Sequence, residues 1–309
     1  MTTATPVGIL RGDARLPEEG TREPRGRQLP IPLALVPATI FMVVLLVMPL
    51  VLLFSYSVLE VDGVAVEGGF SLDTYRTLLG SSYFWFLFVR TFLIAALVTL
   101  LCLVLGYPIA YLITRTHGWF RAVVLIAVAA PLLTSALIRA FAWIVVLGKE
   151  GLVNSVLVGT GVREQPLNLL FEVGTVVTGM TQLLLPFMVI PLISAIQDVP
   201  RDTYEAARNL GAGFTRTFWS VMVPQTVPGI AAGITLVFAL AYSEFTIAVL
   251  LGGGAFNYLS IYIYDAMTSL LDWGRGAAVA SLLLLSSLVT IIGLNVAVRR
   301  ATRWSRTTS

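Results

Sequence analysis

The chain has 309 residues, of which 57% are hydrophobic and only 12% are charged, and its mean hydropathy is +0.88. Soluble globular domains carry about twice that share of charged residues, so the composition excludes one and indicates an integral membrane protein. The formal net charge of +3 does not point to nucleic acid, because the basic residues are scattered over short loops and tails and do not gather on one face.

Residues 1–29 differ in composition from the rest of the chain. Pro, Gly and Thr are frequent there, and arginines such as Arg11 and Arg15 are mixed with acidic residues such as Asp13 and Glu18. Such a segment cannot bury enough apolar surface to fold, so we expect a disordered N-terminal tail. The apolar run that follows is too long for a signal peptide and lacks an A-x-A cleavage site, so we expect it to remain as the first span.

Six apolar runs make up most of residues 30–300, and each is close to or above the roughly 20 residues that cross a ~30 Å hydrocarbon core as a helix. We expect spans at residues 33–58, 85–113, 122–147, 173–196, 227–251 and 277–298. Lipid offers no partners to backbone N–H and C=O groups, so the spans must be helical. The predicted fold is an all-α integral membrane protein with six transmembrane helices, followed by a C-terminal tail at residues 301–309.

Basic residues are distributed unevenly between the two sides of the membrane. The side of the tails carries Arg11, Arg15, Arg22, Arg25, Arg27, Arg115, Arg121, Arg201, Arg208, Arg216, Arg299, Arg300, Arg303 and Arg306. The opposite loops carry Arg76, Lys149, Arg163 and Arg275. Fourteen against four predicts by the positive-inside rule that both termini are cytoplasmic, which an even number of spans also requires.

The longest cytoplasmic loop, residues 197–226, contains start and stop signals for two short helices. Asp198 can cap the first helix, and Gly211 or Gly213 supplies a left-handed stop. A second short helix then ends before Pro224.

Small residues give the first of these helices a low surface. Ala206 and Ala207 stand next to each other there, after Glu205. One interpretation is a docking ledge that a groove of another protein approaches closely. The other is an ordinary helical hairpin in which Glu205 and Arg208 form an exposed ion pair worth about 0.2–0.5 kcal/mol.

The spacing in this loop favours the docking interpretation. Glu205-Ala206-Ala207, three residues, Gly211, nine residues and then a stretch that ends at Pro224 resembles the EAA loop of binding-protein-dependent ABC importer permeases. The glutamate, both alanines, the glycine and the proline match, and valines replace the Ile and Leu of the family pattern. The resemblance implies that Glu205, Ala206, Ala207, Gly211 and Pro224 form the loop that couples the permease to its ATPase.

Other stretches are similar to permeases of the spermidine/putrescine type. They run from Pro131 to Trp143, from Leu185 to Pro191 and from Ser243 to Gly253. Related importers for ferric iron, thiosulfate and phosphonates share parts of these stretches, so an importer of another small solute stays open as an alternative. Ala248 departs from the pattern, since polyamine members often have proline there.

The resemblance implies a MetI-like permease fold in the bacterial inner membrane and a defined set of partners. Two ABC ATPase subunits bind the coupling loops, a second permease subunit completes a pair of which this chain is the first member, and an extracytoplasmic solute-binding protein delivers a small-molecule substrate. The substrate path then lies between the two permeases. The chain itself is not expected to be an enzyme, and no cofactor is implied.

Three charged residues lie within the expected spans, namely Arg90, Arg139 and Glu244. A carboxylate such as Glu244 inside a span costs on the order of 2.5–3.5 kcal/mol, so it must face something polar. One interpretation is a residue of the substrate path that meets an ammonium group. The other is a structural ion pair with Arg139 or with the partner subunit.

Two aromatic residues near these charges are candidates for the same path. Trp143 lies four residues after Arg139 and hence on the same helical face, and Tyr242 lies two residues before Glu244. Both rings are able to bind alkylammonium groups by cation–π attraction. Packing in the core or anchoring at the membrane interface is the other interpretation for both.

The sequence shows no pattern typical of catalysis or metal binding. His117, the single histidine, lies in a short loop, Cys102, the single cysteine, lies in an apolar run, and there is neither an H-E-x-x-H sequence nor a phosphate-binding G-K-[ST] sequence. The energy for transport is therefore expected from another chain. A self-sufficient secondary transporter remains the competing class, and an intramembrane enzyme is a distant third.

Overall fold

The computed structural model describes residues 31–63, 65–254 and 256–306, and the tail expected at residues 1–29 lies outside them. The chain divides into two compact units, residues 1–50 and residues 51–309. The described part of the first unit belongs to helix α1 (Ile31–Val58), which is predominantly apolar, carries no charged residue and contains Pro37 and Pro49.

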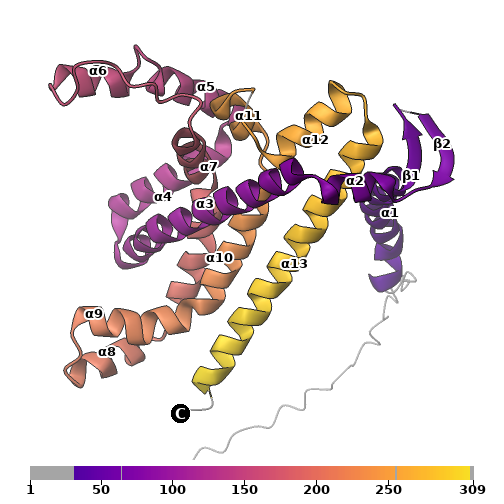
Figure 1. Ribbon diagram of the computed structural model, residues 1–309. Helices are drawn as coiled ribbons and strands as arrows, with labels where there is room; N and C mark the ends of the chain where they lie inside the picture. The colour runs from indigo at the N-terminus through magenta and orange to yellow at the C-terminus, as the bar shows by residue number, and fades with distance from the viewer. Residues whose placement is uncertain (1–30, 64, 255, 307–309) are drawn as a thin grey trace, which may run out of the picture. The chain divides into compact units, whose positions relative to one another are not determined.

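The second unit contains the remaining elements (Figure 1). They are β1 (Leu59–Asp62), β2 (Ala65–Phe70), α2 (Asp73–Gly80), α3 (Ser82–Arg115), α4 (Gly118–Leu133), α5 (Ala136–Leu147), α6 (Leu152–Gly159), α7 (Val173–Gln197), α8 (Arg201–Asn209), α9 (Phe214–Thr217), the π-helix η1 (Phe218–Met222), α10 (Val223–Ser243), α11 (Thr246–Gly252), α12 (Leu259–Thr268) and α13 (Trp273–Arg306). Helix α13 continues into the expected C-terminal tail as far as Arg306.

Within the described residues, six helical stretches are long and apolar enough to cross a membrane. They are Thr39–Val58, Ser82–Arg115, Ala136–Gly159, Val173–Gln197, Phe214–Ser243 and Trp273–Val296, with Gly118–Leu133 as a shorter apolar helix. The all-α fold with six spans is confirmed. The third and fifth expected spans, however, are not single helices.

The third expected span, residues 122–147, is broken at Thr134 and Ser135. Thr134 is extended, with φ −109° and ψ 142°, and ends α4. Pro131 removes one N–H from the last turn of α4, and the hydroxyl of Ser135 accepts a hydrogen bond from the N–H of Leu137 at the start of α5. A proline followed by a capping serine therefore splits an uninterrupted apolar run into two helices.

The fifth expected span, residues 227–251, is broken at Glu244. Helix α10 ends at Ser243, Glu244 is extended with ψ 127°, and α11 begins at Thr246. Glu244 was expected within a continuous span and instead occupies the interruption.

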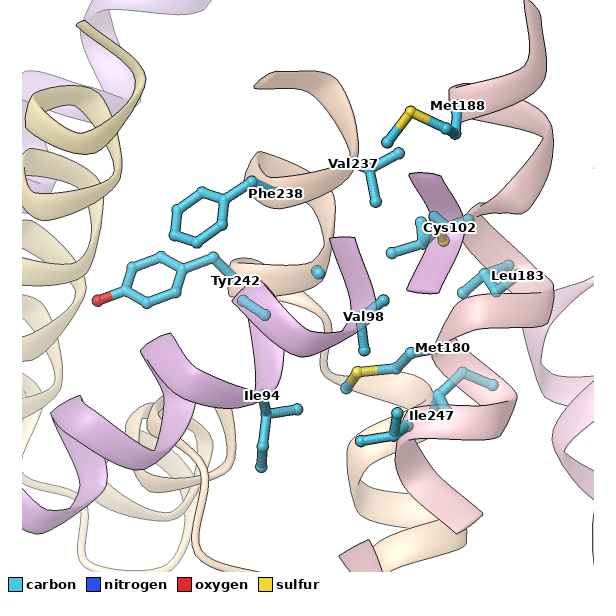
Figure 2. Packing of buried hydrophobic residues seen from close by; sticks show 14 of the residues in the cluster. Ile94, Val98, Cys102, Met180, Leu183, Met188, Val237, Phe238, Tyr242 and Ile247 are labelled. Atoms are coloured by element: carbon cyan, nitrogen blue, oxygen red, sulfur yellow. The ribbon is translucent and has the colours of Figure 1, made fainter. Parts of the chain in front are cut away.

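The core of the second unit lies where α3, α7 and α10 pack against one another (Figure 2). Side chains from all three helices meet there, among them Val98, Met180, Leu183, Met188 and Val237. The single cysteine, Cys102, is fully buried in the same cluster, as expected for a small apolar residue. In contrast, the outer face of α3 exposes Leu93, Leu100 and Val104, which suits contact with lipid.

Glycines allow these helices to approach closely. A Cβ at Gly229 of α10 would collide with the Cβ of Ala195 and lie 2.9 Å from the carbonyl oxygen of Pro191, both in α7. A Cβ at Gly233 would lie 2.5 Å from the sulfur of Met188. Small residues at helix contacts are typical of membrane proteins, because the association depends on close van der Waals packing.

A pair of Gly→Ala substitutions tests this contact. Alanine favours a helix over glycine by about 1 kcal/mol, so Gly293→Ala in α13, where nothing lies within 4 Å of the added Cβ, should leave the protein equally or more stable. Gly229→Ala should lower the stability by about 1–3 kcal/mol despite the same propensity gain, because the methyl group overpacks the α7–α10 contact. Thermal unfolding in detergent measures both, and equal midpoints for the two variants would contradict the close approach.

Candidate functional site

Helix α8 of the expected coupling loop ends in a glycine-dependent turn. Gly211 has φ +81°, whereas Gly213 has φ −66°. The N–H of Ala212 donates to the carbonyl oxygen of Ala207 at 3.1 Å, and the N–H of Leu210 donates to that of Ala206 at 3.1 Å. The bond from Ala212 to Ala207 is the 6→1 bond of a Schellman motif, and Gly211 is the left-handed residue within it. Gly211 therefore ends α8.

The start of the loop differs from the expectation. Asp198 is the C-terminal cap of α7, with its N–H bonded to the carbonyl oxygen of Ser194 at 3.1 Å, so it closes α7. The ion pair of Glu205 with Arg208 was one of the two interpretations of this loop. The side chain of Arg208 is outside the described part of the chain, so this ion pair stays a prediction. Glu205 and Ala206 are exposed and Ala207 is partly exposed.

The second short helix does not end before Pro224, which corrects the expectation. Helix α9 continues through the π-helix η1 into α10, and Pro224 lies in the first turn of α10. A proline in the middle of a helix clashes with the carbonyl of the residue four positions earlier, and the wider π turn directly before Pro224 moves that carbonyl aside. The loop is therefore rigidly joined to a spanning helix.

Helices α8 and α9 lie at the end of α10 opposite to α11 and α12 (Figure 1), and large apolar side chains are exposed there. Leu210 is 89% exposed, Phe214 61% and Trp219 64%. Together with the low surface at Ala206 they form what we call the ledge. An exposed apolar group of this kind is typical of a surface that binds another protein.

Aromatic contacts tie the ledge to the core helix α3. The ring of Phe218 packs edge-on against Tyr107, with centroids 5.3 Å apart, and against Tyr111 at 6.3 Å. The hydroxyl of Tyr107 forms a hydrogen bond with Thr226 of α10 at 2.9 Å. These contacts join the ledge to α3 and α10. Sequence analysis did not identify Tyr107 and Thr226, because neither residue carries a charge or belongs to the motif.

At the other end of α10, side chains satisfy the broken backbone around Glu244. The Oε1 atom of Glu244 accepts a hydrogen bond from the N–H of Ile247 at 3.0 Å, and its carbonyl oxygen accepts one from the hydroxyl of Ser260 at 2.8 Å. The buried hydroxyl of Tyr258 donates to the carbonyl oxygen of Ala241 at 2.7 Å. Ser260 and Tyr258 were missed by sequence analysis, since their role depends on a break that hydropathy does not reveal.

Arg139 lies on α5, which packs against α11, and Glu244 acts on it electrostatically. The single ion pair within 4.0 Å among the described residues joins Arg275 and Asp272, so Glu244 and Arg139 do not form a direct ion pair. The Nε and one Nη atom of Arg139 are buried without a hydrogen-bond partner in the described part of the chain. Trp143, one turn further along α5, is half-buried against the core.

Tyr242 does not join the other three residues proposed for the substrate path. It is 1% exposed, stacks on Phe238 with ring centroids 5.5 Å apart, and its hydroxyl forms a 3.1 Å hydrogen bond with Ser286 of α13. Figure 2 shows the ring pointing away from Met180 and Ile247. Its hydrogen bond and its stacking are those of a core residue.

Six apolar spans and a polar interruption inside the fifth of them are features of a membrane transport protein. Residues 102–303 match the family described as binding-protein-dependent transport system inner membrane component. The chain belongs to this family. It is therefore the permease subunit of an ABC importer and a multi-pass protein of the bacterial inner membrane. Such importers also contain ATPase, permease and solute-binding partners.

Curated relatives include polyamine permeases. The chain is 34% identical to the spermidine/putrescine transport system permease protein PotB of Escherichia coli over 239 residues, which cover 77% of this chain and 86% of PotB. PotB of Haemophilus influenzae is 37% identical over 186 residues, 60% of this chain and 65% of that protein. The molybdenum transport system permease protein ModB of Mycobacterium bovis is 29% identical over 208 residues, 66% of this chain and 75% of ModB.

Solved structures share the fold. A bacterial ABC transporter involved in the import of alginate superimposes with a TM-score of 0.70 at 20% identity, over 87% of this chain and 95% of that one. The alginate transporter in complex with a pentasaccharide-bound periplasmic protein gives 0.71 at 21% identity, over 88% of this chain and 94% of that one.

The left-handed conformation of Gly211 predicts the effect of a larger residue at this position. Gly211→Val forces a β-branched residue into a left-handed conformation, at a cost of about 1–2 kcal/mol, and should tilt α8 and reduce co-purification of the ATPase or uncouple its hydrolysis from transport. Gly213→Val is the matched control, because neither glycine has an atom within 4 Å of an added Cβ and φ at Gly213 suits any residue. Both proteins should reach the membrane. Equal ATPase binding and coupling in the two variants would contradict the role of Gly211.

Proposed function

We propose that this permease carries polyamines of the spermidine/putrescine type as one of a pair of different permease subunits. The observation that supports the substrate most strongly is the 34% identity to a spermidine/putrescine permease over 77% of this chain. In this proposal the ATPase binds the ledge around Glu205, Ala206, Ala207 and Gly211. The substrate passes the opposite end of α10, between the two permeases.

The polar interruption at Glu244 fits the passage of an organic cation. Its carboxylate is partly exposed, and the one hydrogen bond that the structure gives it comes from the N–H of Ile247, which leaves acceptor capacity for an ammonium group. Trp143 supplies an aromatic face in the same region, one helical turn from Arg139. Arg139 opposes a cation, and in this proposal it limits how long the substrate stays beside Glu244.

An importer for another small solute is the second candidate, because the molybdenum permease of Mycobacterium bovis is also similar to this chain. Arg139, with two buried nitrogen atoms that lack a partner among the described residues, would suit an anion. Mass spectrometry of the ligand carried by the associated solute-binding protein distinguishes the two candidates. Spermidine or putrescine is expected, and an oxyanion would overturn the polyamine proposal.

The substitution Glu244→Gln tests the role of the charge. The amide oxygen still accepts the bond from Ile247, so assembly and thermal stability should stay close to those of the wild type. Uptake of labelled putrescine and spermidine should slow by about tenfold or more, since a hydrogen bond to a charged group contributes about 1.5–3 kcal/mol.

Glu172→Gln is the matched control, because Glu172 is an exposed residue at the start of α7. It should leave uptake unchanged. If Glu244→Gln lowers the thermal stability of the complex, Glu244 is a structural residue that balances Arg139. If the complex is stable and its uptake equals that of the wild type, the charge of Glu244 has no role in transport.

The cytoplasmic location of both termini is part of the proposal and rests on the arginine asymmetry. In a Cys102→Ser background, cysteines at positions 2 and 309 should react with a membrane-impermeant thiol reagent only after the cells are opened. A cysteine at position 163, in the loop expected outside, should react in intact cells. Labelling of either terminus from outside would contradict this topology.

A further inference from the structure

A cavity of about 230 Å³ lies behind the coupling loop, between the turn that joins α3 to α4 and the segment that joins α7 to α8. Its polar lining is strongly basic and is contributed by Thr114, Arg115, His117, Arg121 and Gln197. No carboxylate is among the described residues that line it. None of the ledge residues is among the described residues that line the cavity.

Three features of the cavity attract an anion. Arg115 and Arg121 both line it, and the guanidinium group of arginine binds phosphate oxygens in a bidentate manner. The guanidinium of Arg115 also lies over the ring of Tyr111, 5.3 Å from its centre, which limits its rotamers.

The third feature is the start of α4, a helix of 16 residues. Its N-cap residue is His117, whose side chain makes no capping hydrogen bond, so the N–H groups of the first turn receive no acceptor from it. Free N–H groups and the positive end of the helix dipole favour an anion at this position. Because His117 and Arg121 flank this turn, the helix end and the side-chain charges act on the same space.

We propose that this cavity binds a phosphate group, and that its source is the head group of an anionic phospholipid. The spanning helices α3 and α7 end at Arg115 and Gln197, which places the cavity at the level of the lipid head groups. Trp119, directly beside it on α4, is 76% exposed, as is typical of an aromatic residue at the membrane interface. The assignment to the cytoplasmic leaflet rests on the proposed topology. The bound phosphate joins the α3–α4 turn to the base of the coupling loop.

Binding is measured on the assembled importer in phosphatidylcholine nanodiscs, without transport, so that the result does not depend on the polyamine proposal. Short-chain phosphatidylglycerol is titrated and bound lipid is counted by native mass spectrometry. The double variant Arg115→Gln/Arg121→Gln should bind it about 25-fold more weakly, since each arginine near an anionic head group contributes roughly fivefold. Arg300→Gln, which removes an exposed arginine at the end of α13, should change binding less than twofold.

Inorganic phosphate distinguishes the two sources of the phosphate group. Competition with the lipid at millimolar phosphate would assign the site to a soluble phosphate compound, and no competition assigns it to the lipid. If the double variant does not assemble, Gln197→Glu adds a negative charge to the intact lining and should weaken lipid binding in the same way. Equal phosphatidylglycerol binding by wild type and by either cavity variant would overturn the proposal.

Discussion

The hydrocarbon core supplies no hydrogen-bond partner for an open backbone group, and each irregular segment of this permease is built to meet that constraint. Where α10 stops inside the fifth span, Ser260, Tyr258 and the carboxylate of Glu244 take the place of the missing helical partners. Where the third span is interrupted, Ser135 caps α5. Further along, the buried side chain of Asn154 donates to the carbonyl oxygens of Gly148 and Leu167 and accepts from the N–H of Leu167.

The same constraint explains why the interruptions are not random defects. A break in a lipid-facing position would leave several backbone groups unpaired, so breaks persist only where the protein surrounds them or where they line a polar path. The break at Glu244 lies between α10 and α11, and α11 packs against the α5 helix that carries Arg139. It therefore brings two opposite charges into one region of an otherwise apolar molecule.

Between this break and the ledge stands a tightly packed set of helices. Gly229 and Gly233 of α10 bring α7 within contact distance, and Tyr107 joins α3 to the start of α10 through Thr226. Close-packed interiors transmit displacement instead of absorbing it. Side chains in contact thus connect the ledge with α10, whose far end holds the polar interruption.

The sequence predicted those parts of the structure that depend on local chemistry. The number of spans follows from hydropathy, and the stop at Gly211 follows from the need for a left-handed residue at a helix end. Sequence analysis did not predict the breaks at Thr134 and Glu244, because a single residue hardly changes the average hydropathy of a span. Pro131 followed by Ser135 nevertheless indicated the break at Thr134. Tyr242 was a candidate for the substrate path because the sequence of an apolar helix does not indicate which face is buried. Its hydrogen-bond partner, Ser286, is 44 residues away in the sequence.

Transport by the purified importer tests most directly whether this permease works as part of an ATP-driven polyamine importer. Proteoliposomes that contain this permease, its partner permease and the ATPase are supplied with the solute-binding protein and labelled spermidine, with no ion gradient across the membrane. We expect spermidine to accumulate only when both ATP hydrolysis and the binding protein are present. Accumulation driven by an imposed ion gradient in the absence of ATP would contradict it.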